Sequence, residues 1–118
     1  MSAETIDFEN NKIQLKKGSL EFCILLIISR DEAYVSDILS ELKQADLIVV
    51  EGTLYPLLSR MRGAGLLNYS WVESQSGPPR KYYSLTPAGR TTLKKLKENW
   101  EDFTKSINKL INIYEKND

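Results

Sequence analysis

Between residues 51 and 67 the hydrophobic positions of the chain recur with the period of a helix. Apolar side chains stand at i, i+3, i+4 and i+7, on one side of the predicted helix: Leu54, Leu57, Leu58 and Met61. Thr53 is the predicted N-cap, and Pro56 is tolerated because it lies in or near the first turn. Gly63 and Gly65 offer left-handed positions that end the helix and turn the chain.

The opposite side of this predicted helix carries hydrogen-bond donors and cations but no carboxylate: Tyr55, Ser59, Arg60 and Arg62. A helix that packs one side on a core and meets phosphates and base edges with the other has this distribution. A solvated amphipathic helix without a partner shows the same pattern, so this segment alone does not decide between the two interpretations.

Two earlier segments are also predicted to be helical. Residues 20–28 are apolar nearly all round, which favours a helix buried in a small core, although a buried strand also fits so β-branched a run. Cys23, inside this run, is interpreted as a core residue rather than a nucleophile. Ser36 or Asp37 can cap a second helix, in which the apolar spacing returns: Val35, Ile38, Leu39 and Leu42.

Together these three segments form a helix-turn-helix arrangement whose third helix is presented outward. Three-helix units also occur in proteins that do not bind DNA, so the order of the helices is not specific by itself. Residues 1–14 show no clear periodicity and are predicted to form a flexible N-terminal arm.

After Gly65 the period of the pattern changes from that of a helix to that of a strand, because Leu67, Tyr69 and Trp71 alternate with their neighbours. Residues 74–79 are rich in turn formers, and residues 80–85 form a predicted returning strand. The connection is too long for a two-residue turn, and the tip is expected to end in Arg80 and Lys81. A hairpin directly after a recognition-type helix is the wing of a winged helix, where basic residues suit phosphate or minor-groove contact.

A last helix is predicted to start at Thr86 and Pro87, with the threonine as N-cap and the proline at the first helical position. Apolar residues then follow at alternating intervals of three and four, a heptad seam: Leu93, Leu96, Trp100, Phe103, Ile107, Leu110 and Tyr114. A helix of about 28 residues is about 42 Å long, whereas a 100-residue domain has a radius of gyration of only about 13 Å. The seam therefore needs a partner, and a second copy of the chain is the most economical one. The alternative is a helix that folds back wholly on its own domain.

The chain has 118 residues, which suits one domain, or a small domain with one long element. Its 16 basic and 16 acidic residues cancel, so only their distribution is informative. Residues 51–90 carry five basic and two acidic residues, a local net charge of +3, whereas residues 1–50 carry five and nine, a local net charge of −4. The positive field is concentrated on the middle of the chain, as a local binding face requires.

Several classes of protein are excluded by what the sequence lacks. Its single cysteine rules out an intramolecular disulfide and fits a reducing cytoplasm. It has no histidine, the commonest metal ligand and general base, and no glycine-rich phosphate loop. The N-terminal residues are acidic and polar and contain no apolar core of signal-peptide length, and no apolar run reaches membrane-spanning length. We therefore expect a cytoplasmic protein that is not an enzyme and uses no metal, cofactor or membrane.

Two separated stretches carry a specific family resemblance. They are Glu51-Gly52-Thr53-Leu54-Tyr55-Pro56-Leu57-Leu58-Ser59-Arg60 and Gly77-Pro78-Pro79-Arg80-Lys81-Tyr82-Tyr83-Ser84-Leu85-Thr86. Shorter matches are Leu15-Lys16-Lys17-Gly18, Gly65-Leu66-Leu67 and Gly89. In these residues the chain resembles the PadR family of bacterial transcriptional regulators. Its single last helix resembles the smaller PadR subfamily, which includes regulators of multidrug efflux pumps.

The resemblance implies a winged helix-turn-helix, a homodimer built by the last helix, and repression from palindromic operators. Many members carry His-Gly-Tyr at the entry to the second helix, where this chain has Tyr34-Val35-Ser36. No role of that motif can therefore be transferred. Transferred by position, Tyr55 and its neighbours would face the major groove, and Lys17, Arg80 and Lys81 would touch the DNA backbone.

The expected fold is mainly α with a β-hairpin. It would comprise an arm (residues 1–14), a winged helix-turn-helix (residues 15–85) and a coiled-coil-like dimerisation helix (residues 86–118). The expected function is that of a homodimeric repressor, and the alternative is a winged-helix protein-interaction module that does not bind DNA. Predicted contacts to double-stranded DNA are Lys17, Thr53, Tyr55, Pro56, Ser59, Arg60, Arg80 and Lys81. Predicted dimer contacts are Leu93, Leu96, Trp100, Phe103, Ile107 and Leu110.

Trp100 and Phe103 are also predicted to line a site for a small effector. Large rings that meet near a two-fold axis hold helices apart and leave a slot in which planar aromatic or cationic compounds can stack. Drug-sensing members of the small PadR subfamily carry a tryptophan at a similar place. The alternative is that Trp100 simply fills the dimer interface.

Overall fold

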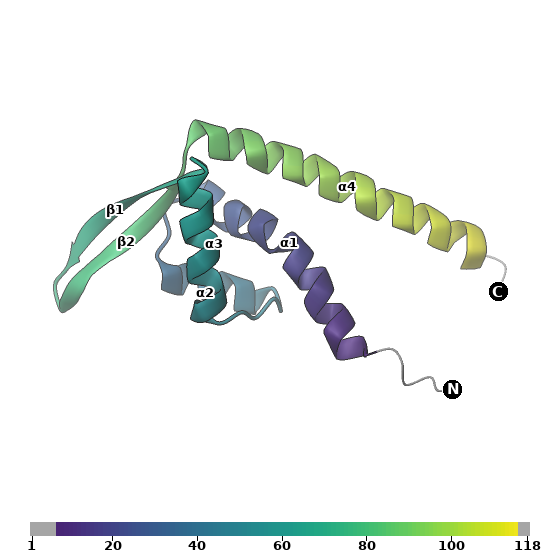
Figure 1. Cartoon of the computed structure of the whole chain (residues 1–118), viewed down its shortest axis with the longest axis horizontal. Helices are drawn as coiled ribbons and strands as arrows, with labels where there is room; N and C mark the ends of the chain where they lie inside the picture. The colour runs from purple at the N-terminus through teal and green to yellow at the C-terminus, as the bar shows by residue number, and fades with distance from the viewer. Residues whose placement is uncertain (1–6, 116–118) are drawn as a thin grey trace.

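The computed structural model describes residues 7–115, which form four helices and one two-stranded antiparallel sheet (Figure 1). In chain order the elements are α1 (Phe8–Arg30), α2 (Val35–Gln44), α3 (Glu51–Gly63), β1 (Leu67–Ser74), β2 (Gly77–Leu85) and α4 (Pro87–Glu115). The prediction of a mainly α fold with a β-hairpin and a long last helix is confirmed. Within the described residues, no helix is long and apolar enough to cross a membrane.

One apolar core lies between the first three helices and the base of the hairpin. Its buried side chains are Leu20, Ile24, Leu25, Ile28, Ala33, Ile38, Leu42, Leu54, Leu58, Met61, Leu67 and Tyr83. The buried members of α2 and α3 belong to the apolar stripes predicted from the sequence. Helix α1 was predicted to be buried nearly all round, but it buries one face, and Leu26 on another face is exposed. Because burial of apolar surface stabilises by about 25 cal/mol per Å², this cluster fixes how α3 lies on the domain. Cys23 packs against the cluster and is partly buried.

Helix α1 begins at Phe8, so residues 8–14 are helical, whereas the sequence predicted a flexible N-terminal arm without periodicity over residues 1–14. The Asp7 carboxylate accepts a hydrogen bond of 3.0 Å from the Asn10 backbone N–H and thereby caps the helix. Among residues 7–115 this segment is exposed throughout and has no apolar stripe, so its helix could not be recognised from periodicity. Residues 1–6 lie outside the described part of the chain.

The starts of α2 and α3 differ from the predicted caps. Asp37 is the third residue of α2, and its carboxylate accepts a hydrogen bond of 3.0 Å from the backbone N–H of Tyr34, the N-cap residue. Helix α3 begins at Glu51 with Val50 as its N-cap residue. Thr53 is therefore the third residue of the helix and not its cap, contrary to the prediction. Pro56 therefore lies in the second turn, where its missing N–H is tolerated on a face that is open to water.

Helix α3 ends in a Schellman motif. The Leu66 N–H donates to the Met61 carbonyl, and the Gly65 N–H donates to the Arg62 carbonyl, both at 3.0 Å. Gly65 has the left-handed φ of 81° that this motif needs. Gly63 is the last helical residue and does not adopt a left-handed conformation, contrary to the prediction.

The hairpin is longer than predicted and has a tighter turn. Strand pairing continues to Ser74 and Gly77, so only two residues form the tip. Arg80 and Lys81 pair with Val72 and Trp71 in the middle of the ladder and are not at the tip, which corrects the prediction. Two prolines fit into β2 because both strands of a two-stranded sheet are edges, where a missing N–H need not break a ladder.

The start of α4 is fastened to the turn that follows α3. Thr86 is the N-cap as predicted, because its Oγ1 accepts a hydrogen bond of 2.9 Å from the Gly89 N–H. The same hydroxyl donates to the Gly65 carbonyl at 2.6 Å, and the Thr86 N–H donates to the Leu66 carbonyl at 3.1 Å. Gly89 is buried here, and a Cβ at this position would overlap the carbonyl oxygen of Leu66.

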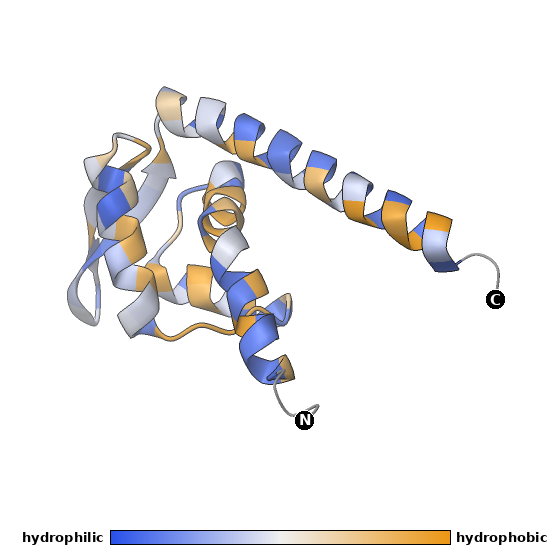
Figure 2. Cartoon of the chain, turned by 45° about the vertical axis from the view of Figure 1, so that its right-hand side comes forward, coloured by the Kyte–Doolittle hydropathy of each residue, from blue (hydrophilic) through white to orange (hydrophobic). Residues whose placement is uncertain are grey.

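Beyond its first turns α4 leaves the core and projects from the domain (Figures 1 and 2). Leu93 and Leu96 pack against the core, whereas the later apolar residues keep between 40% and 58% of their surface exposed: Trp100, Phe103, Ile107 and Leu110. The radius of gyration is 17.8 Å, compared with about 13 Å for a compact 100-residue domain. In the single chain, α4 therefore does not fold back wholly on its own domain.

Candidate nucleic-acid interface

Helix α3 presents an uncharged ridge to solvent. Its apolar stripe is almost completely buried, which fixes the opposite side of the helix outward. Apart from Arg60, the DNA-contact residues predicted on α3 are all exposed: Thr53, Tyr55, Pro56 and Ser59. Tyr55 retains 47% of its surface. The ridge thus offers hydroxyl groups, an aromatic ring and a proline, which can make base-edge and apolar contacts in a groove.

The two arginines of α3 are held on either side of this ridge. Arg60 Nη2 lies 2.8 Å from Glu21 Oε1 of α1. The guanidinium carbon of Arg62 lies 4.6 Å from the centre of the Tyr69 ring of β1. From the sequence, the outward face of α3 has no carboxylate, but the fold brings Glu21 to it from a helix 39 positions earlier in the chain. Arg60 is on the predicted face, but it has a partner.

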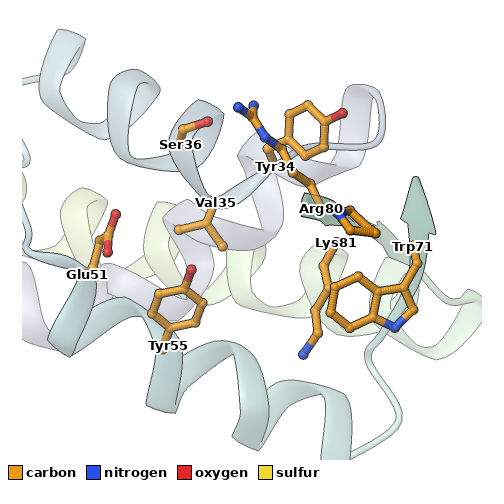
Figure 3. A pocket seen from close by; sticks show the side chains of 9 residues that line it. Tyr34, Val35, Ser36, Glu51, Tyr55, Trp71, Arg80 and Lys81 are labelled. Atoms are coloured by element: carbon orange, nitrogen blue, oxygen red, sulfur yellow. The ribbon is translucent and has the colours of Figure 1, made fainter. Parts of the chain in front are cut away.

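The inner face of the wing places Lys81 beside α3. Its Nζ lies 4.5 Å from the centre of the Tyr69 ring and 5.3 Å from that of Trp71. Trp71 keeps 61% of its surface exposed. In Figure 3 the Lys81 side chain runs between the Trp71 and Tyr55 rings. Aromatic faces attract cations, so the two rings hold the ammonium group next to the α3 ridge.

The outer face of the wing positions Arg80. Its guanidinium carbon lies 5.1 Å from the centre of the Tyr34 ring, and the Tyr34 and Tyr82 rings are 3.6 Å apart at an angle of 32°. A side-chain hydrogen bond with Tyr34 is the main cause that raises the pKa of Tyr82 to about 12. Tyr82 is therefore a neutral phenol at physiological pH, and Arg80 remains the charged group of this cluster.

A surface cavity of about 390 Å³ lies between the start of α2, α3 and the wing, and several of the side chains described above line it (Figure 3). Tyr34 and Ser36 line it from the start of α2, Tyr55 from α3, and Arg80 and Lys81 from the wing. Glu51 contributes a carboxylate, so the cavity is not uniformly positive. The structure thus brings together the predicted residues of α3 and of the wing.

Lys17 is exposed on α1, one helical turn before Glu21. Residues four apart share a helix face, and the Glu21 carboxylate reaches α3. Lys17 therefore shares the helix face of Glu21, the α1 residue that contacts Arg60 of α3.

Sequence reasoning missed Glu21, Tyr34 and Trp71 as members of this surface. The strand alternation identified Trp71 as a residue of one sheet face, but not that this face looks toward α3. Glu21 and Tyr34 gave no signal, because their partners Arg60 and Tyr82 are far away in sequence. In the described part of the chain, no three His, Cys, Asp or Glu side chains are arranged to hold a metal ion.

Comparison with known proteins agrees with this geometry. The Transcriptional regulator PadR-like family matches residues 24–95. A transcriptional regulator from Mycobacterium tuberculosis is 29% identical over 94 residues, which cover 80% of this chain and 87% of that protein. A solved PadR-like transcription factor from Bacteroides fragilis is 51% identical with a TM-score of 0.72, and the match covers 86% of this chain and 98% of the other. A solved PadR-like regulator from Bacillus cereus is 38% identical with a TM-score of 0.75, and the match covers 83% of this chain and 96% of the other.

The family match spans more than half of the chain and includes all of α2, α3 and the wing. Proteins of this family regulate transcription and are not enzymes, and they bind DNA and generally act as dimers. The chain therefore belongs to the PadR-like family of transcriptional regulators, and its function is DNA-binding regulation of transcription.

Proposed function

We propose that this regulator is a homodimeric repressor that binds a palindromic operator with α3 and the wing. The observation that carries the proposal is the uncharged α3 ridge between two arginines, beside a wing whose Arg80 and Lys81 are held on aromatic rings. In this proposal the ridge enters the major groove, and the flanking cations meet the phosphates on its two sides.

The apolar surface of α4 supports dimerisation. Trp100, Phe103, Ile107 and Leu110 are all at least 40% exposed in the single chain, on the face of the heptad seam. The first turns of α1 add apolar side chains that no residue in the described part of the chain covers, with Phe8 73% and Leu15 61% exposed. We propose that α4 of a second copy buries the seam and that the start of α1 borders this interface, since exposed apolar patches of this extent mark interaction sites.

We further propose that an effector binds beside Trp100. A groove of about 420 Å³ lies between α1 and α4 and is lined by Leu15, Phe22, Trp100 and Phe103 among others. The Trp100 and Phe103 ring centres are 6.4 Å apart. A planar aromatic or cationic compound could stack on these rings. Its binding would change the angle between the two α4 helices and release the operator.

The test is operator selection from genomic fragments with the purified chain, followed by a gel-shift titration. A dimeric repressor should recover palindromic sites whose half-sites lie about 34–36 Å apart, and should lose affinity steeply as salt rises. If selection recovers no site and binding to duplex DNA shows no salt dependence, the chain is better described as a protein-interaction module.

A further inference from the structure

Arg60 differs from the other cations of the nucleic-acid interface because a carboxylate already contacts its guanidinium. The Nη2 of Arg60 and the Oε1 of Glu21 are 2.8 Å apart, in a hydrogen-bonded ion pair that joins α3 to α1. Both side chains face water, with 63% of Arg60 and 47% of Glu21 exposed. The pair therefore lies on the binding surface and plays no part in the core.

The neighbouring cations provide an internal comparison. Arg62 lies over the Tyr69 ring, Arg80 over Tyr34, and Lys81 over two wing rings. An aromatic face orients a cation and leaves its charge available to an anion. Within the described residues, Arg60 is the one of these four cations that is paired with a carboxylate. A carboxylate thus neutralises the arginine on one flank of α3, whereas Arg62 on the other flank lies against an aromatic ring.

We infer that Glu21 is a specificity-determining residue, which neutralises Arg60 until a DNA phosphate replaces its carboxylate. The inference rests on the proposed DNA-binding role of α3. An exposed ion pair is weak because water and salt screen both charges. A phosphate that is held in place by a fitted α3 can therefore displace Glu21. On random DNA the ridge of α3 does not fit, so the carboxylate stays beside Arg60 and repels the backbone.

Glu21 affects the two kinds of DNA unequally. Nonspecific binding depends almost entirely on neutralised phosphates, so it is weakened by the loss of one effective cation in each protomer. Operator binding adds base-edge contacts by residues such as Tyr55 and Ser59, which hold the backbone close to Arg60. Glu21 thus lowers random affinity more than operator affinity and widens the ratio between them.

The test compares the natural full chain with Glu21→Gln on a short random-sequence duplex and on an operator recovered by selection. The amide keeps the size of the side chain and removes its charge. We expect random affinity at low salt to rise about three- to tenfold, and the slope of log K against log salt to steepen by about 0.9 for each protomer. Operator affinity should rise less, so the ratio of operator to random affinity should fall.

Two controls separate the ion pair from a general change in charge. Glu98→Gln removes the same charge from an exposed position on α4 and should leave the random affinity and its salt slope unchanged. In an Arg60→Ala background, Glu21→Gln should no longer steepen the slope. Circular dichroism checks that each variant is folded.

The inference is overturned if Glu21→Gln binds random DNA no better than Glu98→Gln does. It is also overturned if Glu21→Gln weakens binding to both duplexes, since Glu21 would then hold Arg60 in its contact position. A natural chain that binds neither duplex at any salt concentration overturns the proposed function itself, and with it this role of Glu21.

Discussion

At the scale of single residues, Gly89 controls how closely α4 approaches the turn after α3. A Cβ at this position would overlap the Leu66 carbonyl oxygen, and a backbone atom cannot rotate aside as a side chain can. We expect Gly89→Ala to lower the free energy of unfolding by about 1–3 kcal/mol, the usual range for overpacking. Urea denaturation followed by circular dichroism measures this difference.

Gly63→Ala is the matched control, because Gly63 is helical and a Cβ there would meet nothing within 4 Å. It should leave the free energy of unfolding unchanged or raise it by up to about 1 kcal/mol. If the two variants were equally stable, the close contact between α4 and Leu66 would not exist in solution.

Cys23 should react slowly with thiol reagents in the folded chain. Burial raises the pKa of its thiol, and the hydrogen bond with Ser19 only partly opposes this effect. A raised pKa means less of the reactive thiolate at any pH below it. The rate of modification by a disulfide reagent at pH 8, measured with and without denaturant, should be at least about tenfold lower in the folded protein. Equal rates in the two conditions would contradict the partly buried position of Cys23.

At the scale of elements, the sequence predicted those parts of the fold that depend on local pattern. The stripe of α3 and the Thr86 cap of α4 were found because periodicity and capping act within a few residues. The hairpin tip was misplaced because two adjacent prolines look like a loop, although an edge strand accepts them. The Arg60–Glu21 pair could not be predicted, because it depends on how α1 and α3 are packed.

Helix α3 and the wing should contribute to binding in different ways. Tyr55→Ala removes an exposed ring from the α3 ridge, so it should weaken operator binding by about 1–3 kcal/mol and random binding much less. Arg80→Ala and Lys81→Ala should weaken both about equally and lower the salt slope by about one unit for each lost phosphate contact. Salt titrations of the three variants on both duplexes measure these effects. An unchanged ratio of operator to random affinity for Tyr55→Ala would remove its role in readout.

At the scale of the whole molecule, α4 is expected to hold two chains together. Phe103→Glu would place two carboxylates against an apolar surface, where each unpaired buried charge costs several kcal/mol. Light scattering after size exclusion should show a dimer for the natural chain and a monomer or aggregate for this variant. Asn112→Glu adds the same charge to an exposed position on the polar side of α4 and should remain dimeric. A natural chain that is monomeric at micromolar concentration would rule out the dimer.

The proposed effector site can be tested by fluorescence with planar cationic dyes. Trp100→Phe should bind such dyes several-fold more weakly than the natural chain, because the larger ring and its stronger cation–π attraction are lost. Trp71 remains in both proteins as an internal reference, far from α4 on the wing. Equal quenching and equal affinity in the two proteins would leave Trp100 as a packing residue.

The hydrogen bond from Thr86 to the Gly65 carbonyl has a consequence for the spacing of the half-sites that a dimer can bind. This hydrogen bond attaches the first turn of α4 to the turn after α3. The direction in which the heptad seam faces is therefore fixed relative to the exposed ridge of α3. Each residue added between Gly89 and Leu93 would rotate the seam by about 100° and advance it by about 1.5 Å. The number of residues between Gly89 and Leu93 would then determine the distance between the two half-sites that a dimer can bind.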